Sequence, residues 1–117
     1  MAYMLLVVEK AGDRAARSQS EGSALYDRML RFSEDLKQRG LLTLGQSLTT
    51  DTDGARVTVK GEKSIVRDGP FSEAKEMIGG IFMLTCATRE QAIDIARECP
   101  AAEWATVEVR ELGPCFE

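Results

Sequence analysis

The chain begins with a segment in which every position is apolar. Residues 2–8, AYMLLVV, predict a strand, and alternation along a strand divides its side chains between two faces. A strand that is apolar on both faces must be covered on both, and a single layer of helices covers only one. This strand is therefore a first indication of a second subunit. One face carries Tyr3, Leu5 and Val7, and the other carries Met4, Leu6 and Val8.

Two segments have the periodicity of amphipathic helices, and each begins with a capping box. Ser18 with Glu21 predicts the start of a helix over residues 18–39, and Thr88 with Gln91 predicts the start of another. Each helix has an apolar stripe at helical spacing. The stripes are Leu25, Met29, Phe32 and Leu36 in the first helix and Ala92, Ile95, Ala96 and Cys99 in the second.

The remaining apolar segments predict strands and complete the fold. They are residues 41–48, 56–60, 63–67, 81–86 and 105–112, and the second and third flank Gly61-Glu62 as a hairpin. Without that hairpin the order is β-α-β-β-α-β. We therefore expect an α+β fold of ferredoxin-like type over residues 1–117 as one domain, with an inserted hairpin and helices on one face of an antiparallel sheet. A symmetric homodimer pressing sheet against sheet would cover the open face.

Composition narrows the classes of protein. Hydrophobic residues make up 44% of the 117 and charged residues 29%, as in ordinary globular chains. The net charge of −4, without a basic cluster, argues against a nucleic-acid partner. No apolar run approaches the ~18 residues needed to span a bilayer, so we expect no membrane association. The N-terminal segment lacks the basic start of a signal peptide, which favours a cytoplasmic location.

The chain has no histidine, which restricts its chemistry. Catalysis by Ser-His-Asp or Cys-His groups and histidine-ligated metals are excluded, so acid–base chemistry would fall to carboxylates, Lys, Tyr or Cys. Cys86, Cys99 and Cys115 match no zinc spacing. We expect reduced thiols with a packing role, Cys115 being the most accessible, and neither bound zinc nor a cofactor. A weak Mg²⁺ or Ca²⁺ site at Asp68, Glu73 and Glu76 is an open alternative.

The segment RDGPFSEAKEMIGG, residues 67–80, has a structural interpretation. Asp68 can accept backbone hydrogen bonds in an Asx turn, Gly69 can adopt positive φ, and the following proline restricts the chain further. Phe71 would then close the sheet edge, and Gly79-Gly80 would allow a bulge or a close approach of two backbones. A rigid turn accounts for everything before Ser72.

A functional interpretation starts from the charges of the same segment. A rigid turn does not require Glu73, Lys75 and Glu76, and carboxylates beside a lysine can have pKa values that diverge once partly buried. A solvated charge cluster is the competing explanation. In the functional interpretation Asp68 is a candidate catalytic base. The candidate ligand-binding residues are Arg67, Gly69, Pro70, Phe71, Glu73, Lys75 and Glu76.

The motif DGPFSEAKE is very similar to the DGPFAETKE motif of the YCII-related, or DGPF-domain, family. The strand segments YMLLV, GLLTLGQSL and VEVREL also resemble that family, so the resemblance covers essentially the whole chain. It implies a dimeric α+β barrel. Some relatives are thought to use a His-Asp pair, and a few act on chlorinated aromatic compounds. Asp68 matches the motif's carboxylate, but without histidine that mechanism does not carry over.

Two functions follow from these observations. The first is an enzyme or binding protein for a small molecule, with a pocket between the sheet and the DGPF loop. The second is a non-catalytic regulatory module acting through a protein partner. The resemblance implies that partner, because DGPF-type proteins are often encoded beside, or fused to, extracytoplasmic-function sigma factors. Tyr26 and Leu30 could form its contact surface, or could simply widen the buried stripe of their helix.

Overall fold

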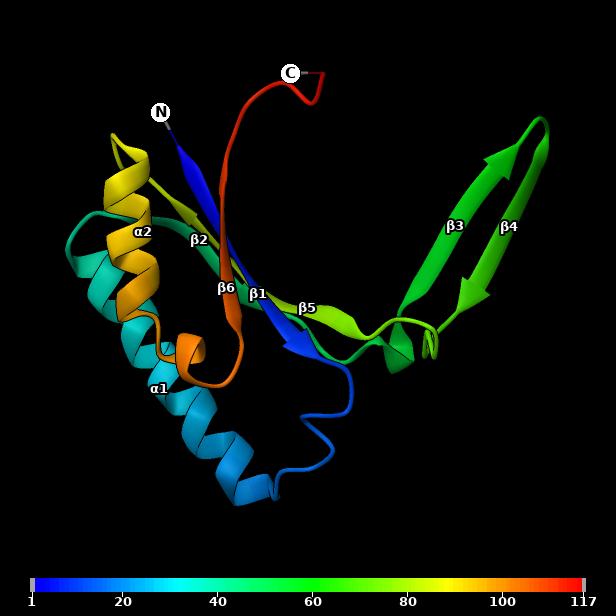
Figure 1. Cartoon of the computed structure of the whole chain (residues 1–117), viewed down its shortest axis with the longest axis horizontal. Helices are drawn as coiled ribbons and strands as arrows, with labels where there is room; N and C mark the ends of the chain where they lie inside the picture. Colours follow the sequence, from blue (N-terminus) through cyan, green and yellow to red (C-terminus); the bar gives the residue numbers. More distant parts are fainter. Residues whose placement is uncertain (1, 117) are drawn as a thin grey trace.

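A four-stranded antiparallel sheet forms the centre of the protein, in a computed structural model that describes residues 2–116 (Figure 1). Its strand order is β2-β5-β1-β6. Without the hairpin, the order along the chain is β-α-β-β-α-β, and the predicted ferredoxin-like arrangement is confirmed. The sheet strands are β1 (Tyr3–Lys10), β2 (Leu42–Ser47), β5 (Glu76–Leu84) and β6 (Thr106–Glu111).

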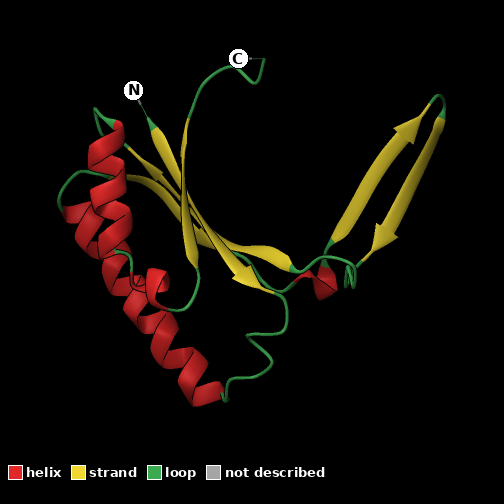
Figure 2. Ribbon diagram, viewed as in Figure 1, coloured by secondary structure: helices red, strands yellow, loops and turns green. Residues whose placement is uncertain are grey.

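Two helices cover one face of this sheet (Figure 2). They are α1 (Gln19–Gln38) and α2 (Arg89–Glu98), with short 3₁₀ turns at η1 (Asp51–Asp53) and η2 (Pro100–Glu103). Both predicted capping boxes are present: the Ser18 hydroxyl accepts from the Glu21 N–H at 3.1 Å, and Thr88 accepts from Gln91 at 3.2 Å. Among residues 2–116, no helix is long and apolar enough to cross a membrane.

The core lies between the helices and the sheet. Phe32 of α1 and Phe82 of β5 meet edge to face with ring centroids 5.4 Å apart, a favourable aromatic geometry. Leu5, Leu36 and Leu84 are completely buried around them. The predicted stripe of α2 is entirely buried, whereas α1 buries only the C-terminal part of its stripe.

Strand β5 differs from its prediction at both ends. It begins at Glu76 and ends at Leu84, whereas the apolar run predicted residues 81–86. The register against β1 shifts between Val7 and Val8, which leaves Gly79 as an extra residue in a bulge. Glu76 and the glycine pair Gly79-Gly80 hid the first half of this strand, because backbone pairing with β1 and β2 does not require apolar side chains there.

The face of the sheet opposite the helices is mainly apolar over β1 and β5, whereas β6 contributes Thr106, Glu108 and Arg110 to it, and no other element of residues 2–116 covers it (Figure 2). We call it the open face. Alternation along β1 places there the even-numbered residues of that strand, as predicted, and the register places their neighbours beside them. Its apolar residues are Met4, Leu6, Val8, Leu44, Ile78, Ile81 and Met83.

The hairpin of β3 (Ala55–Lys60) and β4 (Lys63–Asp68) forms a separate two-stranded sheet. It projects from the body on the side opposite the helices (Figure 1), and we call residues 55–68 the arm. The radius of gyration is 16.0 Å. A compact chain of this length would have a value of about 13 Å, so the arm extends the molecule substantially.

Candidate functional site

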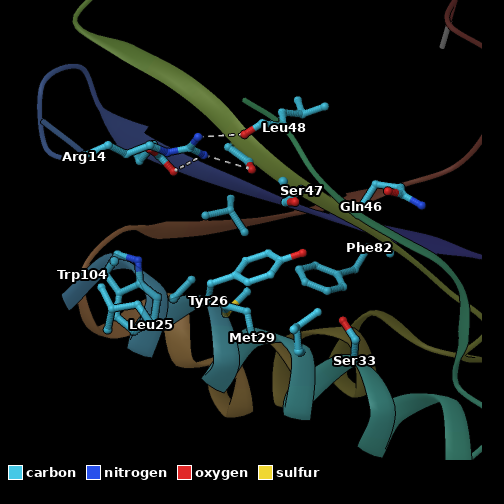
Figure 3. A pocket seen from close by; sticks show the side chains of 18 of the residues that line it. Arg14, Leu25, Tyr26, Met29, Ser33, Gln46, Ser47, Leu48, Phe82 and Trp104 are labelled. Atoms are coloured by element: carbon cyan, nitrogen blue, oxygen red, sulfur yellow. Dashed lines mark hydrogen bonds and ion pairs between the residues drawn. The ribbon is translucent and has the colours of Figure 1, made fainter. Parts of the chain in front are cut away.

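A cavity of about 620 Å³ lies between α1 and the sheet (Figure 3). Its volume is in the range of small-molecule sites. Tyr26 and Met29 project from α1 into this space, Phe82 lies beside Tyr26, and Arg14 lies toward one end. We call it the helix cavity. Its other side-chain walls include Val7, Leu25, Leu30, Ser33, Leu48 and Trp104.

The helix cavity exists because α1 packs on the sheet with only its C-terminal half. Phe32 and Leu36 are buried, whereas Leu25 and Met29 are half-buried, and the N-terminal end of α1 lies away from the sheet (Figure 1). The part of the sheet that faces the N-terminal half of α1 contains glycines. Glycines line the cavity at positions 45, 79 and 80, so its floor there is backbone without side chains.

An ion pair lies at one end of the cavity. Glu9 is only 6% exposed, and Arg14 contacts both of its oxygens, with Nε–Oε1 at 2.6 Å and Nη2–Oε2 at 3.2 Å. Arg14 also donates to the carbonyls of Leu48 at 2.8 Å and Gly79 at 3.3 Å. The connector before α1 is thereby tied to β1, β5 and the segment after β2. A bidentate arginine–carboxylate pair of this kind is strong and geometrically specific.

Gly79 leaves room for this ion pair. A Cβ at position 79 would overlap Oε2 of Glu9 and would lie 2.7 Å from Nη2 of Arg14. Real Cβ atoms essentially never approach other atoms so closely. The bulge in β5 therefore serves the site directly, because it brings a residue without a side chain against the ion pair.

The chemistry of the helix cavity is that of binding. The positive charge of Arg14 is matched by Glu9, and both carboxylate oxygens of Glu9 are engaged. The hydroxyls of Tyr26 and Ser33 add hydrogen-bonding groups to mainly apolar walls. Such a lining suits a mostly apolar ligand oriented by a few polar contacts.

The sequence interpretation missed Glu9 and Arg14, although one of them left a signal. Tyr3, Leu5 and Val7 predict the inward face of β1, and Glu9 continues that alternation with a charge. Carboxylates are almost never fully buried without a partner, so an inward glutamate indicates a buried cation nearby. No local pattern identifies Arg14 as that cation, because it lies in the connector.

The DGPF loop is held by a residue outside the motif. The Phe71 N–H donates to Oδ2 of Asp51 at 3.2 Å, and the Gly69 N–H donates to the Gly54 carbonyl at 2.8 Å. A Cβ at Gly69 would overlap the Asp51 carbonyl. The expected roles are therefore corrected: Asp51 accepts the hydrogen bond assigned to Asp68, and Gly69 is needed for close backbone approach, since its φ is not positive.

Two arginines of the arm lie over the phenyl ring of the motif. Phe71 is buried, and the guanidinium carbons of Arg56 and Arg67 lie 4.0 and 5.5 Å from its ring centroid. Glu73 forms ion pairs with both arginines. Its pKa is lowered mainly by its own backbone N–H and also by Arg67. Phe71 therefore closes the base of the arm, whereas we expected it at the sheet edge.

A second hollow of about 540 Å³ lies between the base of the arm and the sheet, and we call it the arm-base hollow. It brings together only two of the predicted site residues, Phe71 and Glu76. Asp68 and Lys75 are exposed, and Asp68 lines neither hollow. Of the predicted site residues, the structure thus brings Arg67, Phe71 and Glu73 together at the base of the arm, and it places Phe71 and Glu76 in the arm-base hollow.

The three thiols are free in the structure. Cys86 and Cys99 are buried and Cys115 is exposed, as predicted. Burial raises the pKa of the Cys86 and Cys99 thiols, so both stay protonated near neutral pH and are poor nucleophiles. Within residues 2–116, no group of three His, Cys, Asp or Glu side chains is placed to hold a metal ion.

The fold and the site define an α+β protein of ferredoxin-like type with a ligand-sized cavity under its first helix and a projecting hairpin. The YCII-related domain model matches residues 1–115, and the chain belongs to that family. It is also similar to an uncharacterised protein of Rhizobium meliloti (strain 1021). The two are 29% identical over 115 residues, which cover 97% of this chain and 93% of the relative.

Gly79→Ala should destabilise the protein by about 1–3 kcal/mol. The added methyl group must displace the Glu9 carboxylate or the Arg14 guanidinium, and forcing extra atoms into a packed site typically costs about 1–3 kcal/mol. Chemical denaturation followed by circular dichroism measures the change in free energy of unfolding.

Gly113→Ala is the matched control, because a Cβ there meets nothing within 4 Å and φ is not positive. We expect a change within about 0.5 kcal/mol, as for most surface substitutions. Equal stability of the two variants would show that the ion pair does not constrain position 79.

Proposed function

We propose that this protein binds a small, mainly apolar molecule in the helix cavity. The observation that carries the proposal is the glycine floor beneath the raised half of α1, which leaves about 620 Å³ unfilled. A cleft of this size, with mainly apolar walls and a few polar groups, is typical of a small-molecule binding site. Tyr26 and Leu30 line this cavity and are each 49% exposed, which accounts for both residues without a protein partner.

Gly22→Leu should abolish binding while preserving the fold. Gly22 lines the cavity, and a Cβ there meets nothing within 4 Å, so the leucine side chain enters open space. Leucine also favours a helix over glycine by about 1 kcal/mol. The fluorescent apolar probe anilinonaphthalene sulfonate reports occupancy, and we expect its affinity to fall at least ~10-fold.

Ser23→Leu is the control for this experiment. Ser23 is the next residue of α1, is exposed and does not line the cavity, so the same side chain is added outside it. Probe affinity should stay within about twofold of the unmodified protein. Equal loss in both variants, or no loss in Gly22→Leu, would exclude the helix cavity as the binding site.

We also propose that the protein is a cytoplasmic homodimer joined through the open face. Seven apolar side chains lie on this face, including Leu44 and Ile78 at 41% and 45% exposure. Contiguous apolar patches on a monomer mark interaction surfaces. A second copy offers a matching surface, as two-fold symmetry requires. Association with a sigma factor, which the family resemblance implies, stays a prediction.

Light scattering at micromolar concentration should give twice the mass of one chain, and Leu6→Glu should give a monomer. Leu6 lies on the central strand β1, between Ile81 and Glu108 in the register, so a glutamate there places a charge in the middle of the interface. Circular dichroism checks that the variant is folded. A stable monomer of the unmodified protein would exclude the dimer.

Asp68 as a functional carboxylate is a separate proposal, which Asp68→Asn tests. Its side chain is exposed and makes no ion pair or hydrogen bond with another side chain of residues 2–116, so stability should change by less than about 0.5 kcal/mol. Loss of a general base would lower turnover or binding by about 100-fold. We expect probe binding to survive, because Asp68 does not line the helix cavity.

Asp51→Ala provides the contrast to Asp68→Asn. Asp51 accepts the Phe71 N–H, so its loss should cost about 1 kcal/mol of unfolding free energy. A larger loss of stability in Asp68→Asn than in Asp51→Ala would show that Asp68 supports the loop after all.

A further inference from the structure

The two faces of the arm differ in chemistry. Strand pairing places Val57 opposite Val66, and alternation puts Val59 on the same face. These three valines are 61–65% exposed, and we call this side of the arm the valine face. The opposite face carries Ile65 among cations. Those cations are Arg56, Lys60, Lys63 and Arg67.

The valine face has no partner within the described chain. The arm is a two-stranded sheet that pairs with no strand of the body. A two-stranded hairpin alone is marginally stable in water, and valines that stay exposed to solvent contribute no hydrophobic stabilisation. The arm therefore requires another surface to cover this face.

The base of the arm holds it away from the body. Gly69 lies against the Asp51 backbone, and the Phe71 N–H donates a hydrogen bond to the Asp51 carboxylate. Arg56 and Arg67 lie over the phenyl ring. These contacts restrain rotation of the arm about its base. The projection of the arm is a built feature of the fold, which presents the valine face in advance of binding.

The arm stands on the side of the sheet that bears the open face, away from the helices (Figure 1). The arm-base hollow joins these two parts of the molecule: Val8 and Ile78 line it from the open face, Ala55 and Arg56 line it from the arm, and Phe71 lines it from the loop below. A molecule seated on the open face therefore also meets the base of the arm.

The open face is small for a stable interface when it acts alone. Four strands of about six residues cover roughly 20 Å by 20 Å, or on the order of 400 Å² in plan. A standard interface buries about 800 Å² per partner. The valine face of one arm adds roughly 200 Å². In a symmetric dimer each copy buries its own valine face and also the surface that receives the partner's arm, so the area buried per copy rises by roughly 400 Å².

We propose that the arm is a clasp for a second copy of this chain, with its valine face packed on the partner that occupies the open face. This inference rests on the proposed homodimer and adds to it the surface that completes the interface. The cationic face of the arm stays in water, where its lysines are solvated.

Val66→Glu tests the clasp, and Ile65→Glu is its matched control. The residues are adjacent on β4, are 61% and 54% exposed, and lie on opposite faces of the arm. Sedimentation velocity over a concentration series measures the dimer dissociation constant. We expect Val66→Glu to raise it at least ~10-fold, since a charge would be buried, and Ile65→Glu to change it less than about threefold.

A second pair of variants, on strand β3, keeps the test valid if one of the first variants misfolds. Val57→Glu should act like Val66→Glu, and Thr58→Glu like Ile65→Glu, because the pairing places them on corresponding faces. In the unmodified protein, amide hydrogen exchange of residues 55–68 should slow as concentration rises through dimer formation.

The outcomes separate the two proposals. A monomeric unmodified protein overturns both the homodimer and the clasp. A dimer whose dissociation constant responds equally to Val66→Glu and Ile65→Glu, or more to the latter, overturns the clasp and leaves the dimer. Exchange of the arm that is independent of concentration in a dimer also overturns the clasp.

Discussion

The contact between Glu9 and Arg14 organises the end of the molecule where the helix cavity lies. A carboxylate that is 6% exposed needs a polar or charged partner, and Arg14 supplies one from the connector between β1 and α1. Arg14 also donates hydrogen bonds to the Leu48 and Gly79 carbonyls, so the connector before α1 is tied to β1, to β5 and to the segment after β2. The N-terminal half of α1 can therefore lie away from the sheet and still be held in place.

Two parts of the molecule are thus built on different principles. In the body, helices and sheet bury a shared apolar core around Phe32 and Phe82. In the arm, apolar side chains are displayed and the restraint comes from polar and cation–aromatic contacts at its base. A glycine at a point of close approach serves each part, Gly79 in the body and Gly69 at the arm.

The sequence predicted the features that depend on neighbours along the chain. Both capping boxes, the α2 stripe and the hairpin turn at Gly61 follow from local spacing, and all are present. The fold class followed from the order of these elements. The candidate site was harder to predict because its contacts join distant residues: Asp51 holds Phe71 across 20 positions, and Arg14 reaches Gly79 across 65. The density of charges in residues 67–80 drew attention to that segment. The helix cavity instead forms where the sheet has glycines in place of larger side chains.

The backbone floor of the helix cavity has a consequence for how such a site can change during evolution. The three glycines of this floor have no side chains to substitute, and a side chain at position 79 would have to displace the ion pair. The opposite wall is one surface of α1, formed by Leu25, Tyr26, Met29 and Ser33, among others. Selection on these helix positions alone could reshape the volume, polarity and preferred ligand of the cavity. The architecture thus separates the residues that maintain the fold from those that set ligand preference.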